Sequence, residues 1–87
     1  MTYTIKCCGP SKDFFLTPEQ SITTHTQINP LEIKALLLNN ISPKANLSEA
    51  QAMLDASLIA SKEKVLNNDN PVAHHEYLFL LPPVCGG

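Results

Sequence analysis

The stretch Glu76–Gly87, EYLFLLPPVCGG, decides the fold predicted for this 87-residue chain. Its first half, Glu76–Leu81, is a strand-forming run with apolar side chains on both faces. One face carries Leu78 and Leu80, and the other carries Tyr77, Phe79 and Leu81. A strand that is apolar on both faces lies in the centre of a sheet or keeps one face for a partner. We therefore expect the last strand to be central.

The second half of the stretch, residues 82–87, is predicted to be an extended tail attached to a domain of residues 1–81. Pro82-Pro83 favours polyproline geometry, which leads the chain straight out of the sheet. Gly86-Gly87 has no side chains and tolerates unusual backbone angles, so the tail suits a narrow pocket in another protein. It would deliver the Gly87 carboxylate, which becomes an acyl electrophile when it is adenylated by ATP.

Two more strands are expected near the start of the chain. The run Thr2–Cys8 is rich in strand formers and ends at the turn signal Gly9-Pro10, with Tyr3, Ile5 and Cys7 on one face. The run Gln20–Ile28 is rich in Thr and Ile, and we expect it to pair with the first strand as a hairpin. Residues 57–66 predict either one strand or a short strand and a turn, and residues 67–71 predict a turn.

The clearest helix signal begins at Asn29. Asn29 is a good N-cap, Pro30 suits the first helical position and Glu32 completes a capping box. Pro43 prevents continuation of the helix. Apolar residues recur at helical spacing and predict the buried face: Ile33, Leu36, Leu37 and Ile41.

A second, short helix is expected over Ser48–Leu54, opened by a box of Ser48 and Gln51. The predicted order is strand, strand, helix, short helix, strand, strand. With the last strand beside the first and the main helix across one face, this order predicts an α+β roll.

Composition excludes several classes of function. The net charge is −2, there is no arginine and the six lysines are scattered, so nucleic acid is not an expected partner. No apolar run approaches the ~20 residues of a membrane span, and the first residues lack a secretory signal, so we expect a cytoplasmic protein without a membrane partner. Three cysteines without a C-x-x-C pair favour neither a disulfide framework nor a metal site.

Three segments resemble the small subunit of molybdopterin synthase, in the ubiquitin-like sulfur-carrier group that includes the thiamin-pathway carrier. LLPPVCGG (Leu80–Gly87) is similar to the family's PPVxGG after a hydrophobic strand. IKCCGPSKDF (Ile5–Phe14) resembles its opening, and LIASKEKVLNNDNPV (Leu58–Val72) matches its middle strand and turn in spacing. The chain departs from the family pattern at Lys62, at His74-His75 and at Cys85.

The resemblance implies the β-grasp fold, with a mixed sheet, and the role of a sulfur carrier. A separate adenylating enzyme would use ATP and magnesium to join Gly87 to AMP, and sulfur would then replace AMP to leave a thiocarboxylate. The tail would next enter the large catalytic subunit of a heterotetramer and give its sulfur to the pyranopterin precursor of the molybdenum cofactor. The chain itself is expected to bind no cofactor or metal and to be no enzyme alone.

Parity along the strands predicts the docking residues. If Leu78 and Leu80 face the helix, Phe79 and Leu81 face outward, and Val65 and Cys8 are candidate neighbours. Buried in a partner, each large side chain would contribute about 1.5–3 kcal/mol. The predicted partner contacts are thus Cys8, Val65, Phe79, Leu81 and the tail residues Pro82, Pro83, Val84 and Cys85. The predicted reactive residues are Gly86 and Gly87.

Other interpretations remain open at the level of sequence. Within the fold, the chain could carry sulfur for thiamin or another pathway. It could instead be a ubiquitin-like modifier joined through Gly87 to lysines, or a binding module in which Gly-Gly is incidental. Cys85 is expected to be a tolerated small residue, and His74 and His75 are expected to lie in a surface turn.

Overall fold

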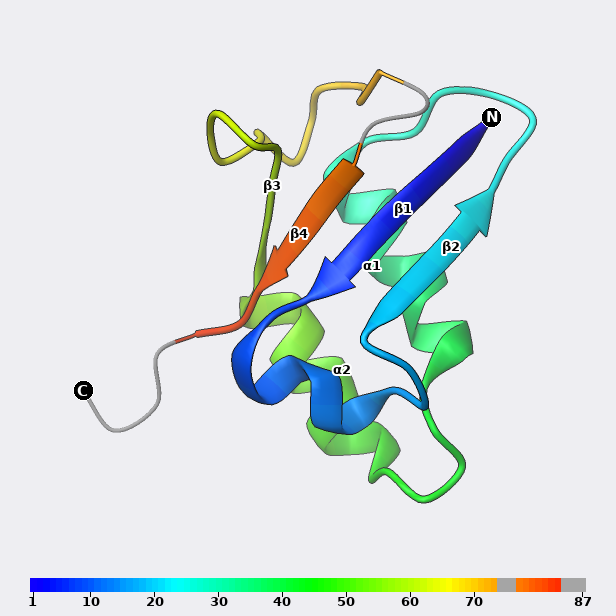
Figure 1. Cartoon of the computed structure of the whole chain (residues 1–87), viewed down its shortest axis with the longest axis vertical. Coiled ribbons are helices and arrows are strands. Elements are labelled where there is room, and N and C mark those ends of the chain that lie inside the picture. Colours follow the sequence, from blue (N-terminus) through cyan, green and yellow to red (C-terminus); the bar gives the residue numbers. More distant parts are fainter. Residues whose placement is uncertain (74–76, 84–87) are drawn as a thin grey trace.

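The helices of the protein cover one face of a mixed β-sheet and leave the other face open (Figure 1). The computed structural model describes residues 1–73 and 77–83. The elements in chain order are β1 (Thr2–Cys7), the 3₁₀ helix η1 (Gly9–Phe14), β2 (Glu19–Thr23), α1 (Pro30–Leu37), the 3₁₀ helix η2 (Leu38–Asn40), α2 (Leu47–Ala56), β3 (Leu58–Ala60) and β4 (Tyr77–Leu81). In this part of the chain the strands form a four-stranded sheet in the order β2-β1-β4-β3.

Strand pairing confirms the predicted architecture. β1 and β2 pair antiparallel from Thr2↔Thr23 to Lys6↔Glu19, as expected of a hairpin. β4 lies between β1 and β3, parallel to the first and antiparallel to the second. The first and last strands are therefore the two central ones, and the protein has the α+β β-grasp fold.

Burial alternates along both central strands, as a period of two requires. On β4, Leu78 and Leu80 are fully buried, whereas the residues between and beside them are half-buried. On β1 the predicted inward residues are the buried ones: Tyr3, Ile5 and Cys7. These side chains pack against Ile33 and Leu37 of α1, so the core lies between the sheet and the helices.

The Tyr3 hydroxyl joins three segments that are far apart in sequence. It donates a hydrogen bond to the carbonyl of Val72 at 3.0 Å and accepts one from the amide of Ile28 at 3.3 Å. The amide of Val72 in turn donates to the carbonyl of Ile28 at 2.8 Å. Tyr3 is completely buried, so these bonds satisfy polar groups that water cannot reach.

The capping box of α1 is confirmed in both directions. The Asn29 side chain accepts from the Glu32 amide at 2.8 Å, and the Glu32 carboxylate accepts from the Asn29 amide at 3.0 Å. Pro30 is the first helical residue, and the helix passes into η2 before Pro43. Of the predicted stripe, Ile33 and Leu37 are fully buried, and Leu36 and Ile41 pack at its margin.

The second helix differs from the prediction in start, cap and length. α2 spans Leu47–Ala56 and its N-cap is Asn46, whose side chain accepts from the Glu49 amide at 3.0 Å. Gln51, expected in a box with Ser48, instead donates to Asp55 one turn later, at 3.3 Å. With 10 residues against 8 in α1, α2 is the longer α-helix of the two, not a minor one.

Strand boundaries also differ from those expected. β2 ends at Thr23 rather than Ile28, because Thr23 pairs with Thr2, the first residue of the partner strand β1. Thr24 Oγ1 then donates to the Thr26 carbonyl at 2.6 Å and turns the chain. β1 ends at Cys7, one residue early. Residues 57–66 form the short strand and turn, with Val65 bridging back to Ala60.

Removal of the Tyr3 hydroxyl should destabilise the fold. We expect Tyr3→Phe to lower the free energy of unfolding by about 1–3 kcal/mol, because the buried Ile28 amide loses its acceptor. Urea denaturation, monitored by circular dichroism, measures this loss of free energy. The matched control is Tyr77→Phe, which removes a hydroxyl on the open face and should cost less. An equal loss in both variants would contradict a special role for Tyr3.

Candidate functional site

The candidate site begins where β4 ends. Leu81 is the last residue of this central strand, and the Cys8 amide donates to the Leu80 carbonyl at 3.1 Å just before it. Pro82 and Pro83 have no N–H group with which to extend the ladder. The chain therefore leaves the sheet at Pro82, and Figure 1 shows it passing outward beyond the end of β4.

Pro82, where the chain leaves the sheet, lies close to Gly9. Gly9, the first residue of η1, has a φ of +53°, in the left-handed region that favours glycine. A Cβ atom at Gly9 would lie 3.7 Å from Cγ of Pro82, so the start of η1 lies beside the exit. Next to them lies an apolar hollow of about 300 Å³, lined by Pro10, Phe14, Ala52, Met53, Pro82 and Pro83.

The open face of the sheet carries apolar side chains beside the exit. Phe79 and Leu81 are half-buried and alternate with the core residues of β4. Leu58 of β3 pairs with Leu81 and is 49% exposed. Val65 is 52% exposed. It forms a β-bridge with Ala60, which in turn pairs with Phe79, so Val65 lies on the same side of the sheet as this group. We call Leu58, Val65, Phe79 and Leu81 the outer patch.

The outer patch contains three residues of the predicted docking set and adds one. Phe79 and Leu81 occupy adjacent outward positions on β4, and Val65 lies on the neighbouring segment as proposed. Leu58 was not singled out by the sequence. Once β3 is known to pair with β4, the alternation of faces along β4 also places Leu58 on the open face. The sequence of β3, which is only three residues long, does not show this pairing.

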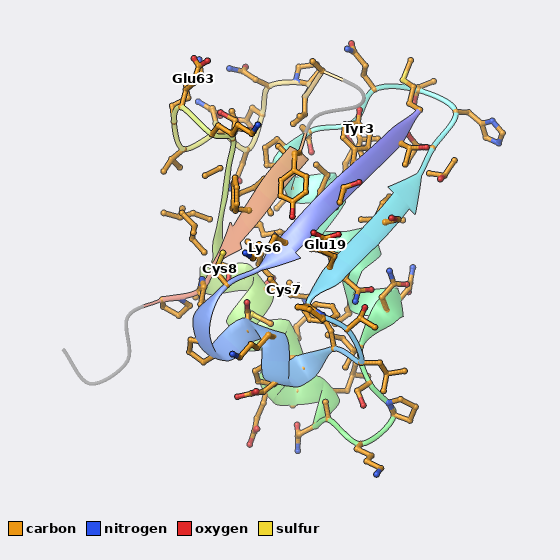
Figure 2. The ribbon with its side chains drawn as sticks, viewed as in Figure 1. Tyr3, Lys6, Cys7, Cys8, Glu19 and Glu63 are labelled. Carbon is orange, nitrogen blue, oxygen red and sulfur yellow. The ribbon has the colours of Figure 1, made fainter. Side chains whose placement is uncertain are left out.

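The other half of the open face is polar. The Tyr77 hydroxyl donates to the Glu19 carboxylate, and this hydrogen bond is the main cause of a raised pKa for Tyr77. Lys6 pairs in register with Glu19 on one side and with Phe79 on the other. Figure 2 shows Lys6 and Glu19 on the same face, over β1 and β2. The open face is therefore apolar over β3 and the end of β4, and polar over β1, β2 and the start of β4 at Tyr77.

The adjacent cysteines at the end of β1 have different surroundings. Cys7 is 2% exposed, and its burial, with a smaller effect of neighbouring Cys8, raises the pKa of the Cys7 thiol to about 11. Cys8 is partly exposed and points away from the core; its Sγ lies 3.8 Å from the Lys6 carbonyl. Both are free thiols. Figure 2 shows Cys8 next to the end of β4, as expected for the docking set.

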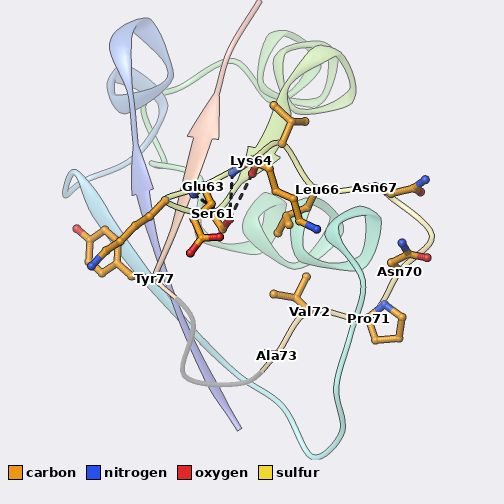
Figure 3. A pocket seen from close by; sticks show the side chains of 12 residues that line it. Ser61, Glu63, Lys64, Leu66, Asn67, Asn70, Pro71, Val72, Ala73 and Tyr77 are labelled. Carbon is orange, nitrogen blue, oxygen red and sulfur yellow. Dashed lines mark hydrogen bonds between the residues drawn. The ribbon is translucent and has the colours of Figure 1, made fainter.

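A larger pocket, of about 750 Å³, lies along the connection that follows β3 (Figure 3). It is lined by Ser61, Lys62, Glu63, Lys64, Val65, Leu66, Asn67, Asn70, Pro71, Val72, Ala73 and Tyr77. The Ser61 hydroxyl accepts hydrogen bonds from the amides of Glu63 and Lys64, and the Asn67 side chain accepts one from Asp69. These side chains hold the turn together, so we assign the pocket no ligand.

Several predicted residues lie outside the described part of the chain. These are Val84, Cys85, Gly86 and Gly87 of the tail, and His74, His75 and Glu76 before β4. The roles assigned to the tail, and its separation from a domain of residues 1–81, stay predictions. Among residues 1–73 and 77–83, no group of three His, Cys, Asp or Glu side chains is placed to hold a metal ion. None of the helices described has the length and apolar character needed to cross a membrane.

Other proteins of known structure share this fold. No protein-family model and no curated protein sequence matches the chain. The solved structures that match include SAMP1 from Haloferax volcanii, with a TM-score of 0.72 and 13% identity, and a complex of subunits 1 and 2 of molybdopterin-converting factor from Helicobacter pylori 26695, with a TM-score of 0.61 and 26% identity. Each match covers 100% of this chain and 100% of the matched chain. The chain shares the β-grasp fold with these structures.

The adjacent thiols of Cys7 and Cys8 should differ in reactivity. In the folded protein we expect iodoacetamide to label Cys8 and to spare Cys7. Cys7 is buried, and near neutral pH its raised pKa leaves about a hundredfold less thiolate than its ordinary value of 9.0 would. Fragment-ion mass spectrometry locates the label, and the urea-unfolded chain, in which both thiols react, is the control. Equal labelling of the two thiols in the folded protein would show that Cys7 is not shielded.

Proposed function

We propose that this chain is a sulfur carrier that acts through the carboxylate of Gly87. A partner enzyme joins this carboxylate to the α-phosphate of ATP with the aid of magnesium, and pyrophosphate leaves. A sulfur nucleophile then attacks the acyl carbon, the bond to AMP breaks and a thiocarboxylate remains. The proposal takes Gly87 as the last residue, and the chain supplies the reacting end rather than a catalytic pocket.

One comparison carries the proposal. The chain matches, over its whole length and at 26% identity, a structure of molybdopterin-converting factor in which subunits 1 and 2 form a complex. The tail motif PPVCGG and the exit of the chain at Pro82, beside the outer patch, support the same interpretation. We therefore propose that the sulfur is given to the pyranopterin precursor of the molybdenum cofactor. We propose that the reaction takes place in the cytoplasm.

The proposed partner is a large catalytic subunit, in a heterotetramer of two large and two small chains. Six residues, 82–87, extend at most about 20 Å, which is enough to reach a pocket inside a neighbouring protein. The outer patch would dock beside the mouth of that pocket, because it lies next to the last described residues of the chain. Binding at the patch would therefore orient the tail toward that pocket.

Sulfur loading is tested by intact mass. After incubation with its adenylating enzyme, ATP, magnesium and a sulfur donor, we expect the chain to gain about 16 Da, the difference between sulfur and oxygen in the terminal carboxylate. Deletion of Gly87 should abolish the gain, and thermal melting of the variant checks that the fold is intact. A ladder of lysine conjugates would favour a protein modifier instead. An unchanged mass in the presence of active enzyme would refute the proposal.

Docking is tested by placing a charge in the outer patch. We expect Phe79→Asp to weaken binding to the large subunit at least about tenfold, because the apolar burial of one large side chain is lost and a charge is desolvated. The matched control is Thr23→Asp, which adds the same charge at an exposed position on the β2 side of the same face. Isothermal titration calorimetry measures both. Equal weakening by the two variants, or none by Phe79→Asp, would remove the patch from the interface.

A further inference from the structure

The two edges of the β-sheet differ in what covers them. Beyond β3 the chain itself continues the main-chain contacts: the Leu66 amide donates to the Ile59 carbonyl at 2.8 Å, and Val65 forms a β-bridge with Ala60. Beyond β2 no further strand follows in the part of the chain that the structure describes. Figure 1 shows β2 as the outermost strand, next to β1. The open edge of the sheet is therefore that of β2.

Hydrogen bonds at the two ends of the β1–β2 hairpin show which residues of β2 face this open edge. The Cys7 amide donates to the Pro18 carbonyl at 2.7 Å, and the Thr24 amide donates to the Met1 carbonyl at 2.8 Å. In an antiparallel pair, residues that bond to the partner strand alternate with residues whose main chain points away from it. Every second residue of β2 therefore directs its N–H and C=O groups outward. These residues are Glu19, Ser21 and Thr23.

The outward groups of β2 are left almost entirely unused. Among residues 1–73 and 77–83, one hydrogen bond reaches them: Thr17 Oγ1 donates to the Glu19 carbonyl at 2.8 Å. A carbonyl oxygen has two lone pairs, so the Glu19 carbonyl can accept a second hydrogen bond. The edge therefore presents a row of main-chain donors and acceptors that another strand can satisfy.

β2 also lacks the features that keep an open edge from pairing. Protected edges carry proline, lysine or a bulge. The strand Glu19–Thr23 contains neither proline nor lysine, and its register with β1 is unbroken. Its one charged side chain, Glu19, accepts a hydrogen bond from the Tyr77 hydroxyl of β4, so this carboxylate lies over its own sheet. The edge is thus neutral and open to an extended segment.

We propose that β2 pairs antiparallel with β2 of a second copy of this chain, with Ser21 opposite Ser21 on a two-fold axis. In this register Glu19 lies opposite Thr23 of the second copy, so each outward residue meets another outward residue and each such pair exchanges two hydrogen bonds. A shift by two residues would leave one outward residue of each β2 without a partner in the other β2. The symmetric register satisfies the most main-chain groups and sets no like charges directly opposite.

The dimer leaves both exits of the chain accessible. The joined sheet has the order β3-β4-β1-β2-β2-β1-β4-β3, which places the two β4 strands about 24 Å apart. The two-fold axis reverses the strand direction, so the two chains leave the sheet at Pro82 toward opposite ends. The outer patch of each copy lies on the half of the sheet away from the contact. The inference therefore goes beyond the proposed function and does not depend on it.

Sedimentation velocity of the full-length chain with a reductant, from about 1 µM to about 1 mM, measures the self-association. We expect a reversible equilibrium between monomer and dimer. Ser21→Lys and Ser21→Asp each set two like charges opposite each other at an exposed position, so each should weaken the dimer at least about fivefold. An equimolar mixture of the two variants should regain the wild-type affinity or exceed it, because unlike charges then face each other.

The matched control is Gln51→Lys, which adds the same charge at an exposed position of α2, away from the sheet edge. It should dimerise as the wild type does. Circular dichroism checks that each variant is folded, and recovery in the mixture separates a charge effect from a folding defect.

A wild type that stays monomeric over the whole range would overturn the inference, as would Ser21 variants that dimerise as tightly as the wild type. A mixture that regains no affinity would also overturn it, since recovery requires Ser21 to lie opposite itself. If Phe79→Asp abolishes the dimer and Ser21→Lys does not, the copies meet through the outer patch and the β2 edge is not the contact. Sulfur loading is measured separately, so a monomeric chain that gains sulfur refutes this inference alone.

Discussion

The parallel pairing of β1 with β4 is the interaction on which the rest of the structure depends. It joins Thr4–Cys7 to Tyr77–Leu80, so the beginning and the end of the described chain share the centre of one sheet. The register decides which side chains of β4 face the helices and which remain on the open face. It also sets Cys8 and Gly9 beside Leu80 and Pro82. The core, the outward positions of Phe79 and Leu81 and the exit of the chain therefore follow from one set of main-chain hydrogen bonds.

Local signals predicted those parts of the fold that local chemistry determines. The box of Asn29 and Glu32 and the alternation along β4 were visible because each depends on residues a few positions apart. The end of β2 was not visible, since it is decided by where the partner strand begins at Thr2. The start of α2 was misplaced because Ser48 and Asn46 are both good caps, and sequence alone did not choose between them. The burial of Lys34, whose Nζ donates to the Ser57 carbonyl at 3.1 Å, also needed tertiary structure.

In the candidate site, too, the sequence predicted what depends on local chemistry and missed what depends on tertiary pairing. The predicted outward positions of Phe79 and Leu81 are found, because strand parity is a property of the strand itself. Leu58 was missed, since its place opposite Leu81 comes from a strand only three residues long. The closeness of Cys8 to the exit depends on pairing across more than 70 residues of sequence. Under the proposed function the fold supplies position and a docking face, while the reacting atoms belong to the last residue.

The Tyr3 hydroxyl has a consequence for the motions of the protein. Residues 24–29 and 71–73 lie outside helices and strands, and segments of this kind usually open with little cost. Here both are anchored to a completely buried side chain of a central strand, through the amide of Ile28 and the carbonyl of Val72. Neither segment can open at these residues without breaking bonds inside the core. Opening either loop at these residues should therefore cost the free energy of these hydrogen bonds, so both loops should be better protected than other segments of this kind.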